Sequence, residues 1–298
     1  MRIAVLMSTY NGKEYIKEQI DSILNQKGEF SLDLLVRDDG STDGTLDILN
    51  DYSRLGKLRW VKGENVGPAK SFIDLLIDNK GYDFYAFSDQ DDVWNLDKID
   101  RALIKIGGNL GPCLYCSNAE LVDANLNSFG RNVYKQYPKL DLCTITCAGG
   151  ALGCTMVFNK SLAEIVWMNS APKKMVLHDF YMAVLCKAVG GKIIYDDYAS
   201  MKYRQHGNNV VGVAATKKNI MNSRIKSIMC KKKVGIAEQC EDILRYSMAD
   251  SSREWIEKVS MYKKNFIHRL ALASSGKTHY INRNMSVKIR LSILFGNR

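Results

Sequence analysis

The chain has little proline, no low-complexity tract and no long apolar run. Only 4 of its 298 residues are proline, so we expect no long disordered linker. No stretch approaches the ~18 consecutive apolar residues of a membrane-spanning helix, and the apolar run Ile3–Met7 is too short for a secretory signal peptide. We therefore expect a cytoplasmic protein whose length allows one large domain, or one domain with an appendage.

The cysteines also lack the partners that a structural zinc site needs. Of the 8 cysteines, Cys113 and Cys116 have C-x-x-C spacing, but neither a second pair nor a nearby histidine accompanies them. Both lie in an apolar stretch, so we expect buried thiols in a strand.

Acidic residues are scarce in the last quarter of the chain. The net charge is +10, yet residues 216–298 hold 18 Lys and Arg against 6 Asp and Glu, which leaves a net charge of −2 for residues 1–215. This asymmetry indicates an anionic partner, either lipid headgroups or nucleic acid.

Two apolar series with helical spacing occur in the same quarter. One runs through Ile220, Ile225, Ile228 and Met229 among lysines and arginines, and the other through Trp255, Val259, Tyr262, Phe266 and Leu270. Helices packed on the preceding domain would explain both series, and so would a basic surface helix resting on anionic lipid.

The first half of the chain alternates between strand-like and helix-like segments. Apolar runs predict strands at 3–7, 32–36, 58–61 and 84–87, and helical periodicity predicts helices at 13–25, 42–52 and 68–79. This order predicts a parallel sheet covered by helices on both faces. Short strands and turns follow at 111–159, helices at 161–168 and 180–189, strands at 193–195 and 201–203, and only helices after residue 212.

Three carboxylates follow the fourth predicted strand in Ser88-Asp89-Gln90-Asp91-Asp92. Like charges at this spacing repel one another and lose hydration if they are partly buried. A divalent cation such as Mg²⁺ or Mn²⁺ would remove both problems, because hard cations prefer oxygen ligands. A D-x-D motif at the end of a strand suits a metal–diphosphate site, although an acidic turn before a helix would also explain it.

A second polar cluster follows the second predicted strand, and a third, Ser8–Asn11, follows the first. Asp39, Ser41 and Asp43 fit the first ligand positions of an EF-hand loop, but Asn50 stands where a bidentate Glu is required. A carboxylate at a strand end can instead accept the imide N–H of uracil or thymine. Ligands of parallel sheets bind at this edge, beyond the carboxyl ends of the strands.

Three single residues are weaker candidates. Lys70 follows glycines whose spacing does not match a phosphate-binding P-loop, so it either faces a nucleotide or is a solvated helix lysine. Asp179, after His178, either caps a helix or does chemistry. His206 lies in a loop beside two asparagines and is either a metal ligand or a structural histidine.

Taken in order, these motifs resemble those of the family 2 glycosyltransferases with the GT-A fold, and within them the rhamnosyltransferase-like enzymes of bacterial surface polysaccharide assembly. The matching segments are Ser8–Gly12, Asp38–Asp43, Asn65–Gly67, Ser88–Trp94, His178-Asp179 and Tyr203–Asn208. The resemblance implies a GT-A catalytic domain over 1–212, with a nucleotide-binding half (1–110) and an acceptor half (111–212). A helical basic extension would follow over 213–298.

The resemblance also implies roles for the candidate residues. Ser8, Tyr10 and Asp39 would line the base pocket, with Lys70 also facing the nucleotide. Asp89 would meet the ribose, and Asp91 would bind Mn²⁺ or Mg²⁺ with His206 as a further ligand. Asp179 stands where the family has its general base, with His178 in place of the usual Glu.

We therefore expect an inverting, metal-dependent transferase that moves one sugar, because the Q-x-x-R-W motif of processive members is absent. The implied donor is dTDP-rhamnose or a UDP-hexose, and the implied acceptor is a lipid-diphosphate-linked saccharide. The extension would meet an anionic membrane surface and no nucleic acid. A sugar-nucleotide pyrophosphorylase would need a glycine-rich basic loop that Ser8–Gly12 lacks, and a non-enzymatic basic binding protein would leave the acidic motifs unexplained.

Overall fold

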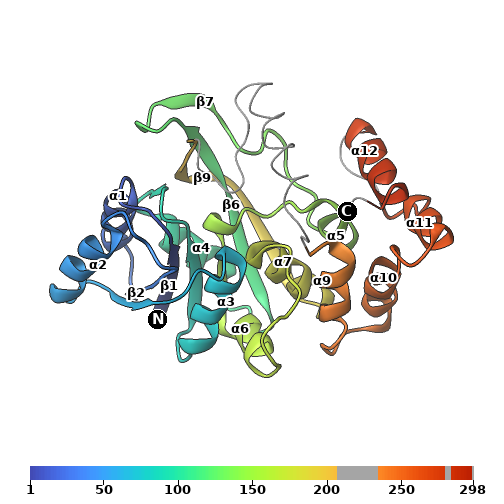
Figure 1. Cartoon of the computed structure of the whole chain (residues 1–298), viewed down its shortest axis with the longest axis horizontal. Helices are drawn as coiled ribbons and strands as arrows, with labels where there is room; N and C mark the ends of the chain where they lie inside the picture. Colours follow the sequence, from blue (N-terminus) through green and yellow to red (C-terminus); the bar gives the residue numbers. More distant parts are fainter. Residues whose placement is uncertain (207–233, 279–282, 297–298) are drawn as a thin grey trace.

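A computed structural model of the chain describes residues 1–206, 234–278 and 283–296. Within these residues, nine strands form one sheet in the order β3-β2-β1-β4-β8-β6-β9-β5, with β7 paired to β6 (Figure 1). The strands are β1 (Arg2–Thr9), β2 (Ser31–Asp38), β3 (Arg59–Lys62), β4 (Phe84–Ser88), β5 (Val93–Trp94), β6 (Cys113–Val122), β7 (Ser128–Asn132), β8 (Val157–Asn159) and β9 (Lys192–Arg204). Strands β1 to β4 are parallel to one another, β8 is antiparallel to β4 and β6, and β6 is parallel to β9. The expected mostly parallel sheet is confirmed.

Helices cover both faces of this sheet. They are α1 (Ile16–Leu24), α2 (Thr45–Arg54), α3 (Pro68–Asp78), α4 (Lys98–Ile106), α5 (Leu142–Ala148), α6 (Lys160–Trp167), α7 (His178–Ala188), α9 (Ile236–Ile243), α10 (Asp250–Ser260), α11 (Phe266–Ala273) and α12 (Arg283–Leu294). Side chains of β1 alternate between two cores: Ile3, Val5 and Met7 join a cluster with α1, α2 and α4, and Ala4 and Leu6 join one with α3, α6 and α7.

One expectation about the strands was wrong. The two strands expected at 193–195 and 201–203 are a single strand, β9, of 13 residues. Asp196 and Asp197 break the apolar pattern, but side chains of other elements donate hydrogen bonds to both carboxylates. Asp196 accepts two hydrogen bonds from Arg101, and Asp197 accepts one from Asn118.

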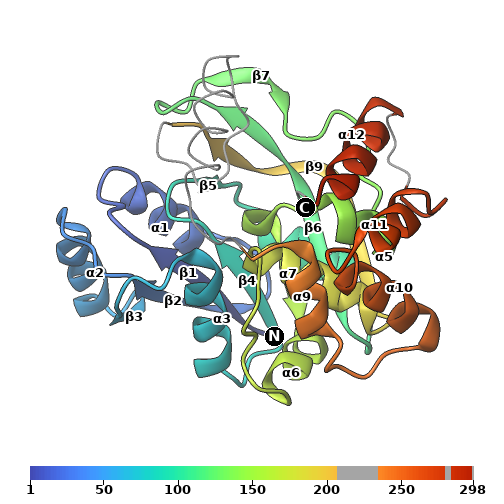
Figure 2. The same ribbon diagram turned by 45° about the vertical axis from the view of Figure 1, so that its right-hand side comes forward.

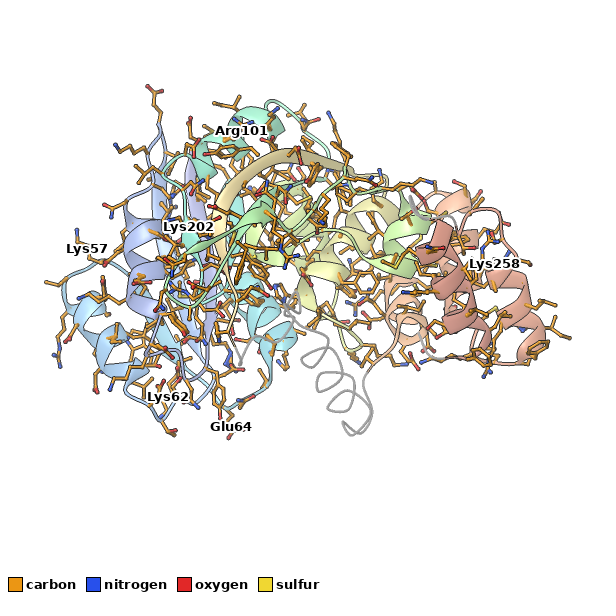
Figure 3. The ribbon with its side chains drawn as sticks, turned by 90° about the horizontal axis from the view of Figure 1, so that it is seen from above. Lys57, Lys62, Glu64, Arg101, Lys202 and Lys258 are labelled. Atoms are coloured by element: carbon orange, nitrogen blue, oxygen red, sulfur yellow. The ribbon has the colours of Figure 1, made fainter. Side chains whose placement is uncertain are left out.

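The C-terminal helices share a core with the sheet domain. Trp255, Val259 and Tyr262 are buried in the cluster that contains α5 and α7, whereas Phe266 and Leu270 are exposed. The first three side chains therefore pack inward, and a lipid-facing role for them was wrong. These helices lie at one end of the molecule, where Figure 3 labels Lys258, far from Lys57 beside α2. The apolar series at 220–229 and the boundary between residues 212 and 213 lie outside the described residues.

Two smaller expectations concern cysteines and membrane spans. Cys113 and Cys116 are buried in β6 and form no disulfide, as expected of thiols in a strand. Among the residues that the structure describes, no helix combines the length and apolar character that crossing a membrane requires.

Candidate active site

The polar loops after β1, β2 and β4 meet at the carboxyl edge of the sheet and are tied together by hydrogen bonds. Gln90 Oε1 accepts from Thr9 Oγ1 at 2.5 Å and from the Tyr10 N–H at 2.9 Å. Asn11 takes the left-handed conformation (φ 49°) that asparagine tolerates, and its Oδ1 accepts from the Thr42 N–H at 2.9 Å. The three loops therefore form one preorganised rim around the candidate nucleotide site.

Asp39, the candidate base-pocket carboxylate, is almost wholly buried beside α3. Its Oδ1 accepts from Arg37 Nη1 at 2.8 Å, and its Oδ2 accepts from the Gly67 N–H at 3.1 Å. Nearby, Ser8 Oγ donates to Ser71 Oγ at 2.7 Å, and the Tyr10 side chain is half exposed. Asp39 and Ser8 are thus held in place by protein partners, and Tyr10 is the one that faces outward.

The acidic residues of the loop after β2, which resembled a calcium site, hold the backbone of that loop in place. Asp38 accepts hydrogen bonds from the Gly40 and Ser41 N–H groups, at 2.9 and 2.8 Å. Asp43 accepts from the N–H groups of Lys13 and Thr45, both at 3.0 Å. These carboxylates shape the turn and the start of α2, as Asp side chains commonly do.

The acidic loop after β4 places carboxylates where their charges are poorly compensated. Burial, the Asp91 charge and the Asp179 charge raise the pKa of Asp89 to about 8. Asp92 is fully buried, and burial with the Asp91 and Asp89 charges raises its pKa well above the usual range. Its Oδ1 accepts from the Arg204 N–H at 3.2 Å, whereas its Oδ2 has no hydrogen bond within the described part of the chain.

Asp91 and His206, the two residues predicted to share a metal, lie together although 115 positions separate them. His206 Nε2 is 2.7 Å from Asp91 Oδ2. Beneath them, ligand atoms of Asp89, Asp92 and Cys154 lie within 4.8 Å of one another. Carboxylates with one imidazole suit Mn²⁺ or Mg²⁺, and a divalent cation would offset both the burial and the repulsion that raise the pKa of Asp89. These residues fit a bound metal.

A buried ammonium lies below the acidic loop. Lys98 on α4 is fully buried, and its Nζ is 4.1 Å from the centre of the Trp94 ring. Burial lowers the pKa of Lys98 to about 8, although the nearby Cys154 and Asp92 oppose this shift. Lys98 therefore interacts electrostatically with Asp92.

Asp179 lies in the first turn of α7 but does not cap the helix. The N-cap is Leu177, which makes no side-chain cap bond. Asp179 Oδ2 instead accepts from the Gly153 N–H at 3.1 Å, and Oδ1 accepts from the Phe180 N–H at 2.7 Å. Burial raises the pKa of Asp179 to about 6 in spite of these hydrogen bonds, which suits a general base at neutral pH.

The residues beside Asp179 fix its position. At Gly153, a Cβ atom would lie only 2.8 Å from the Asp179 Cβ and Oδ2, so the close approach requires glycine. His178 is buried and stacks on Phe72 with ring centres 3.9 Å apart. Burial lowers the pKa of His178 to about 3, so this imidazole is neutral and acts as packing behind the base.

The surroundings of Lys70 favour a solvated helix lysine over a nucleotide contact. Its Nζ lies 2.7 Å from each carboxylate oxygen of Asp74, one turn farther along α3, and the side chain is largely exposed. Its role in nucleotide binding stays a prediction.

Arg204, at the end of β9, is a functional candidate that the sequence analysis missed. Its side chain is only 2% exposed, and its Nε donates to the Asp91 carbonyl at 2.7 Å. The guanidinium also donates to the Ala124 carbonyl, pairs with Glu18, and lies 4.4 Å from the centre of the Tyr15 ring. Arg204 therefore fixes the backbone that presents Asp91, and its place two residues before His206 was the available signal.

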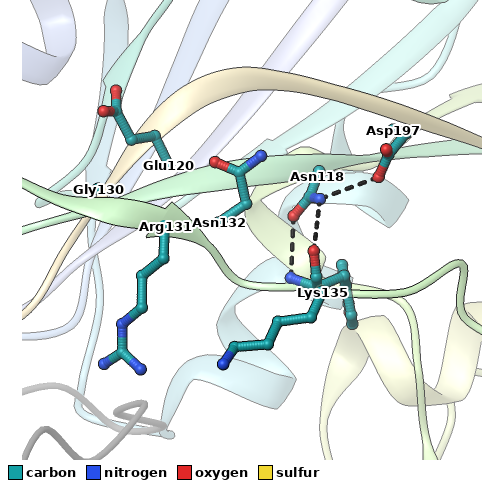
Figure 4. A pocket seen from close by; sticks show the side chains of 8 residues that line it. Asn118, Glu120, Gly130, Arg131, Asn132, Lys135 and Asp197 are labelled. Atoms are coloured by element: carbon teal, nitrogen blue, oxygen red, sulfur yellow. Dashed lines mark hydrogen bonds between the residues drawn. The ribbon is translucent and has the colours of Figure 1, made fainter.

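A cavity of about 470 Å³ opens between β6, β7 and β9 (Figure 4). Asn118 anchors its wall, because its amide donates to the Tyr134 carbonyl at 2.9 Å and to Asp197 at 3.1 Å. Burial, with smaller contributions from Cys116, Cys154 and Asp179, raises the pKa of Tyr134. Arg131 and Lys135 also line the cavity.

Comparison with protein families and curated proteins gives consistent matches. The model of the family described as glycosyl transferase family 2 matches residues 4–165. A dTDP-rhamnosyl transferase, RfbG of Shigella flexneri, is 32% identical over 226 residues, which cover 69% of this chain and 73% of the relative. A putative teichuronic acid biosynthesis glycosyltransferase, TuaG of Bacillus subtilis, is 34% identical over 103 residues, 34% of this chain and 40% of the relative.

Solved structures resemble the whole chain. Residues 1–349 of TarS from S. aureus, in complex with UDP-GlcNAc, match with a TM-score of 0.59 at 18% identity, over 99% of this chain and 82% of that one. A mannosyltransferase from Pyrobaculum calidifontis, in complex with GDP-Man and Mn²⁺, matches with a TM-score of 0.55 at 16% identity, over 99% and 74%. At these identities the likeness shows the fold alone.

Proposed function

Because the chain belongs to glycosyl transferase family 2 and has the GT-A fold, we propose that it transfers one sugar from a nucleoside-diphosphate sugar to an acceptor hydroxyl, with inversion at the anomeric carbon. The observation that carries this proposal is the convergence of the Asp91–His206 pair, Asp89 and Asp179 at one edge of the sheet. Because the chain belongs to this family, we favour a glycosyltransferase over a sugar-nucleotide pyrophosphorylase and over a non-enzymatic binding protein.

The donor is dTDP-rhamnose or a UDP-hexose. The 32% identity to a dTDP-rhamnosyl transferase supports rhamnose, and the UDP-GlcNAc in a structural neighbour supports a UDP sugar. Ser8, Tyr10 and Asp39 line the base pocket, Asp89 meets the ribose, and Lys70 contributes positive charge at the rim.

Asp91 and His206 would hold Mn²⁺ or Mg²⁺, with Asp89 beside them. When bound, the cation would neutralise the negative charge that builds up on the diphosphate as it leaves. Arg204 keeps the Asp91 backbone in place, and Asp92, buried and held by the Arg204 N–H, supports the loop from below.

Asp179 is the general base. Its carboxylate removes the proton of the acceptor hydroxyl while that oxygen attacks the anomeric carbon. The bond between this carbon and the diphosphate oxygen breaks, and the nucleoside diphosphate leaves with the bonding electrons. The Gly153 and Phe180 N–H groups orient the carboxylate so that it can reach the acceptor.

The acceptor is a lipid-diphosphate-linked saccharide of surface polysaccharide synthesis. The cavity beside Tyr134 supports this acceptor, because Asn132 offers an amide to sugar hydroxyls and Arg131 and Lys135 offer charge to phosphate (Figure 4). A lipid-linked acceptor and a basic C-terminal extension together support an anionic membrane surface as a partner.

A donor screen tests the proposal. The purified protein is incubated with dTDP-rhamnose, UDP-hexoses and GDP-mannose, with Mn²⁺, Mg²⁺ or EDTA, and release of nucleoside diphosphate is measured. We expect release from one dTDP or UDP sugar that requires the metal and is suppressed by Asp91→Ala. Metal-independent release that the Asp91 variant retains would overturn the metal assignment, and no release from any donor would overturn the proposed donor class.

A further inference from the structure

The helical hairpin at the C-terminal end exposes an unusual amount of apolar surface. Phe266, Ile267 and Leu270 on α11 and Val287, Leu291 and Phe295 on or just after α12 form what we call the C-terminal apolar patch. Phe266 is 64% exposed, Ile267 75% and Phe295 71%. Single exposed apolar side chains are ordinary, but these six lie on or just after two helices that pack against each other, and together they indicate an interaction surface.

Packing within the protein does not account for this patch. The hairpin is anchored by the opposite sides of its helices, where Leu272 and Ile293 are buried in the main core. Val287, Leu291 and Phe295 instead recur at four-residue spacing, which places them along one outward stripe of α12. The folded chain therefore leaves the apolar side chains of the patch uncovered.

The positive charge of the C-terminal segment indicates which kind of partner the patch binds. From Lys258 to Arg298 the sequence contains nine Lys and Arg and neither Asp nor Glu. A second copy of the chain would bring the same positive charge against itself, so a symmetric dimer through this face is disfavoured. Exposed aromatic and aliphatic side chains set among cations are the composition of segments that rest on anionic lipid.

The position of the hairpin fits the same partner. In both Figures 1 and 2, α12 lies toward the upper side of the molecule, as does β7, which contributes Arg131 to the cavity beside the base. A planar bilayer that met α12 on this side would also face β7 and the cavity that we propose for the acceptor.

We propose that the C-terminal apolar patch docks the protein on an anionic bilayer. Its apolar side chains enter the boundary between headgroups and acyl chains, and the surrounding lysines and arginines contact anionic headgroups. This inference deepens the proposed function by naming the surface that brings the enzyme to a lipid-linked acceptor, and it rests on that function only for its biological purpose.

Flotation of the full-length protein with vesicles, in the absence of any donor, tests the proposal. We expect binding to vesicles of phosphatidylcholine with phosphatidylglycerol, little binding to pure phosphatidylcholine, and weaker binding in high salt because the charge is screened. Phe266→Ser/Ile267→Ser should reduce the partition coefficient at least about tenfold. The matched control is Leu55→Ser/Ile104→Ser, two equally exposed apolar residues outside the patch, which should bind as the wild type does.

Charge reversal provides a second variant that does not depend on removing apolar side chains. Lys264→Glu/Lys288→Glu alters two exposed residues of the hairpin and should also lower the partition by about tenfold or more on anionic vesicles. Equal binding to neutral vesicles, or unchanged binding of both patch variants, would overturn the proposal. A patch variant that changes the sedimentation coefficient but not vesicle binding would show self-association instead.

Donor hydrolysis separates this inference from the proposed function. The patch variants should hydrolyse donor at the wild-type rate in solution, because the patch does not contribute to the active site. If the wild type hydrolyses donor but does not bind vesicles, the proposed docking surface is overturned and the proposed function is not. Vesicle binding without any donor turnover overturns the proposed function alone.

Discussion

Asp179→Asn is the most informative single substitution, because it removes the proposed base while keeping its shape. If Asp179 takes the acceptor proton, its loss should slow transfer by on the order of 10²–10⁴-fold. Donor affinity should change little, since the hydrogen bonds of Asp179 go to Gly153 and Phe180 and its charge is the smallest of the causes that raise the pKa of Asp89. The expected signature is a fall in kcat with little change in the KM for donor.

The effect on stability follows from two opposing terms. The rise in the Asp179 pKa to about 6 means that the ionised carboxylate costs at most about 3 kcal/mol in the folded state at neutral pH, and asparagine removes that cost. Asparagine has one acceptor oxygen, so it loses the bond to either Gly153 or Phe180, which costs about 1–3 kcal/mol. The melting temperature at pH 7 should therefore change by only a few degrees.

The pH dependence supplies a second test of Asp179. A carboxyl with a raised pKa binds protons more tightly in the folded state, so its ionisation lowers stability as pH rises and its protonation restores stability below pH about 6. On acidification from pH 7 to 5, the wild type should therefore gain melting temperature relative to Asp179→Asn. The wild-type kcat should fall over the same interval, as the base becomes protonated.

Stopped assays with a radiolabelled donor and calorimetry with the nucleoside diphosphate measure these quantities. Transfer by Asp179→Asn within a few-fold of the wild-type rate would refute the assignment, and the base would then have to be sought elsewhere in the pocket. A large drop in melting temperature would instead show that Asp179 is mainly structural.

Further substitutions test the surroundings of this base and the metal pair. Gly153→Ala should displace the Asp179 carboxylate, since the new Cβ would lie 2.8 Å from it, and we expect slower transfer with donor affinity retained in calorimetry. Asp91→Ala should abolish turnover and the metal-dependent part of nucleotide affinity without unfolding the protein, because it relieves repulsion, and His206→Ala should give a milder form of this defect. Unchanged metal-dependent affinity in both variants would contradict their assignment. Arg204→Met should weaken nucleotide affinity in Mn²⁺ more than in EDTA. It should also destabilise the fold by about 1–3 kcal/mol, because the Asp91 and Ala124 carbonyls lose their donor. Chemical denaturation measures this loss, and a variant as stable as the wild type would show that the network is dispensable.

The first half of the fold was predictable because its central strands, β1 and β4, are buried on both faces. Such strands are continuous apolar runs, as in Ile3–Met7, and the helices between them keep a helical period. The second half was less predictable because polar residues interrupt β9. Nothing local reveals that Arg101 and Asn118, from two other elements, satisfy Asp196 and Asp197.

Some residues of the candidate site could likewise be predicted from the sequence, and others could not. Short motifs identified Asp91 and His206, and the structure places them 2.7 Å apart. The contact of Gly153 with Asp179 spans 26 positions, and that of Arg204 with the Asp91 carbonyl spans 113. Such pairs depend on tertiary proximity, which spacing does not reveal. Likewise, the helical period of Trp255 and Phe266 predicted a helix but did not reveal that one residue is buried and the other exposed.

The long separation between Asp91 and His206 has a consequence for synthesis of the chain. The acidic loop leaves the ribosome more than a hundred residues before the strand that carries Arg204 and His206. At ~5–20 residues per second, the nascent chain spends several seconds with its carboxylates made but not yet fixed. If Asp91 and His206 hold the metal as proposed, full affinity for metal and nucleotide would arise only after β9 has inserted between β6 and β5. A nascent or truncated chain that ends before this strand would then not sequester the donor.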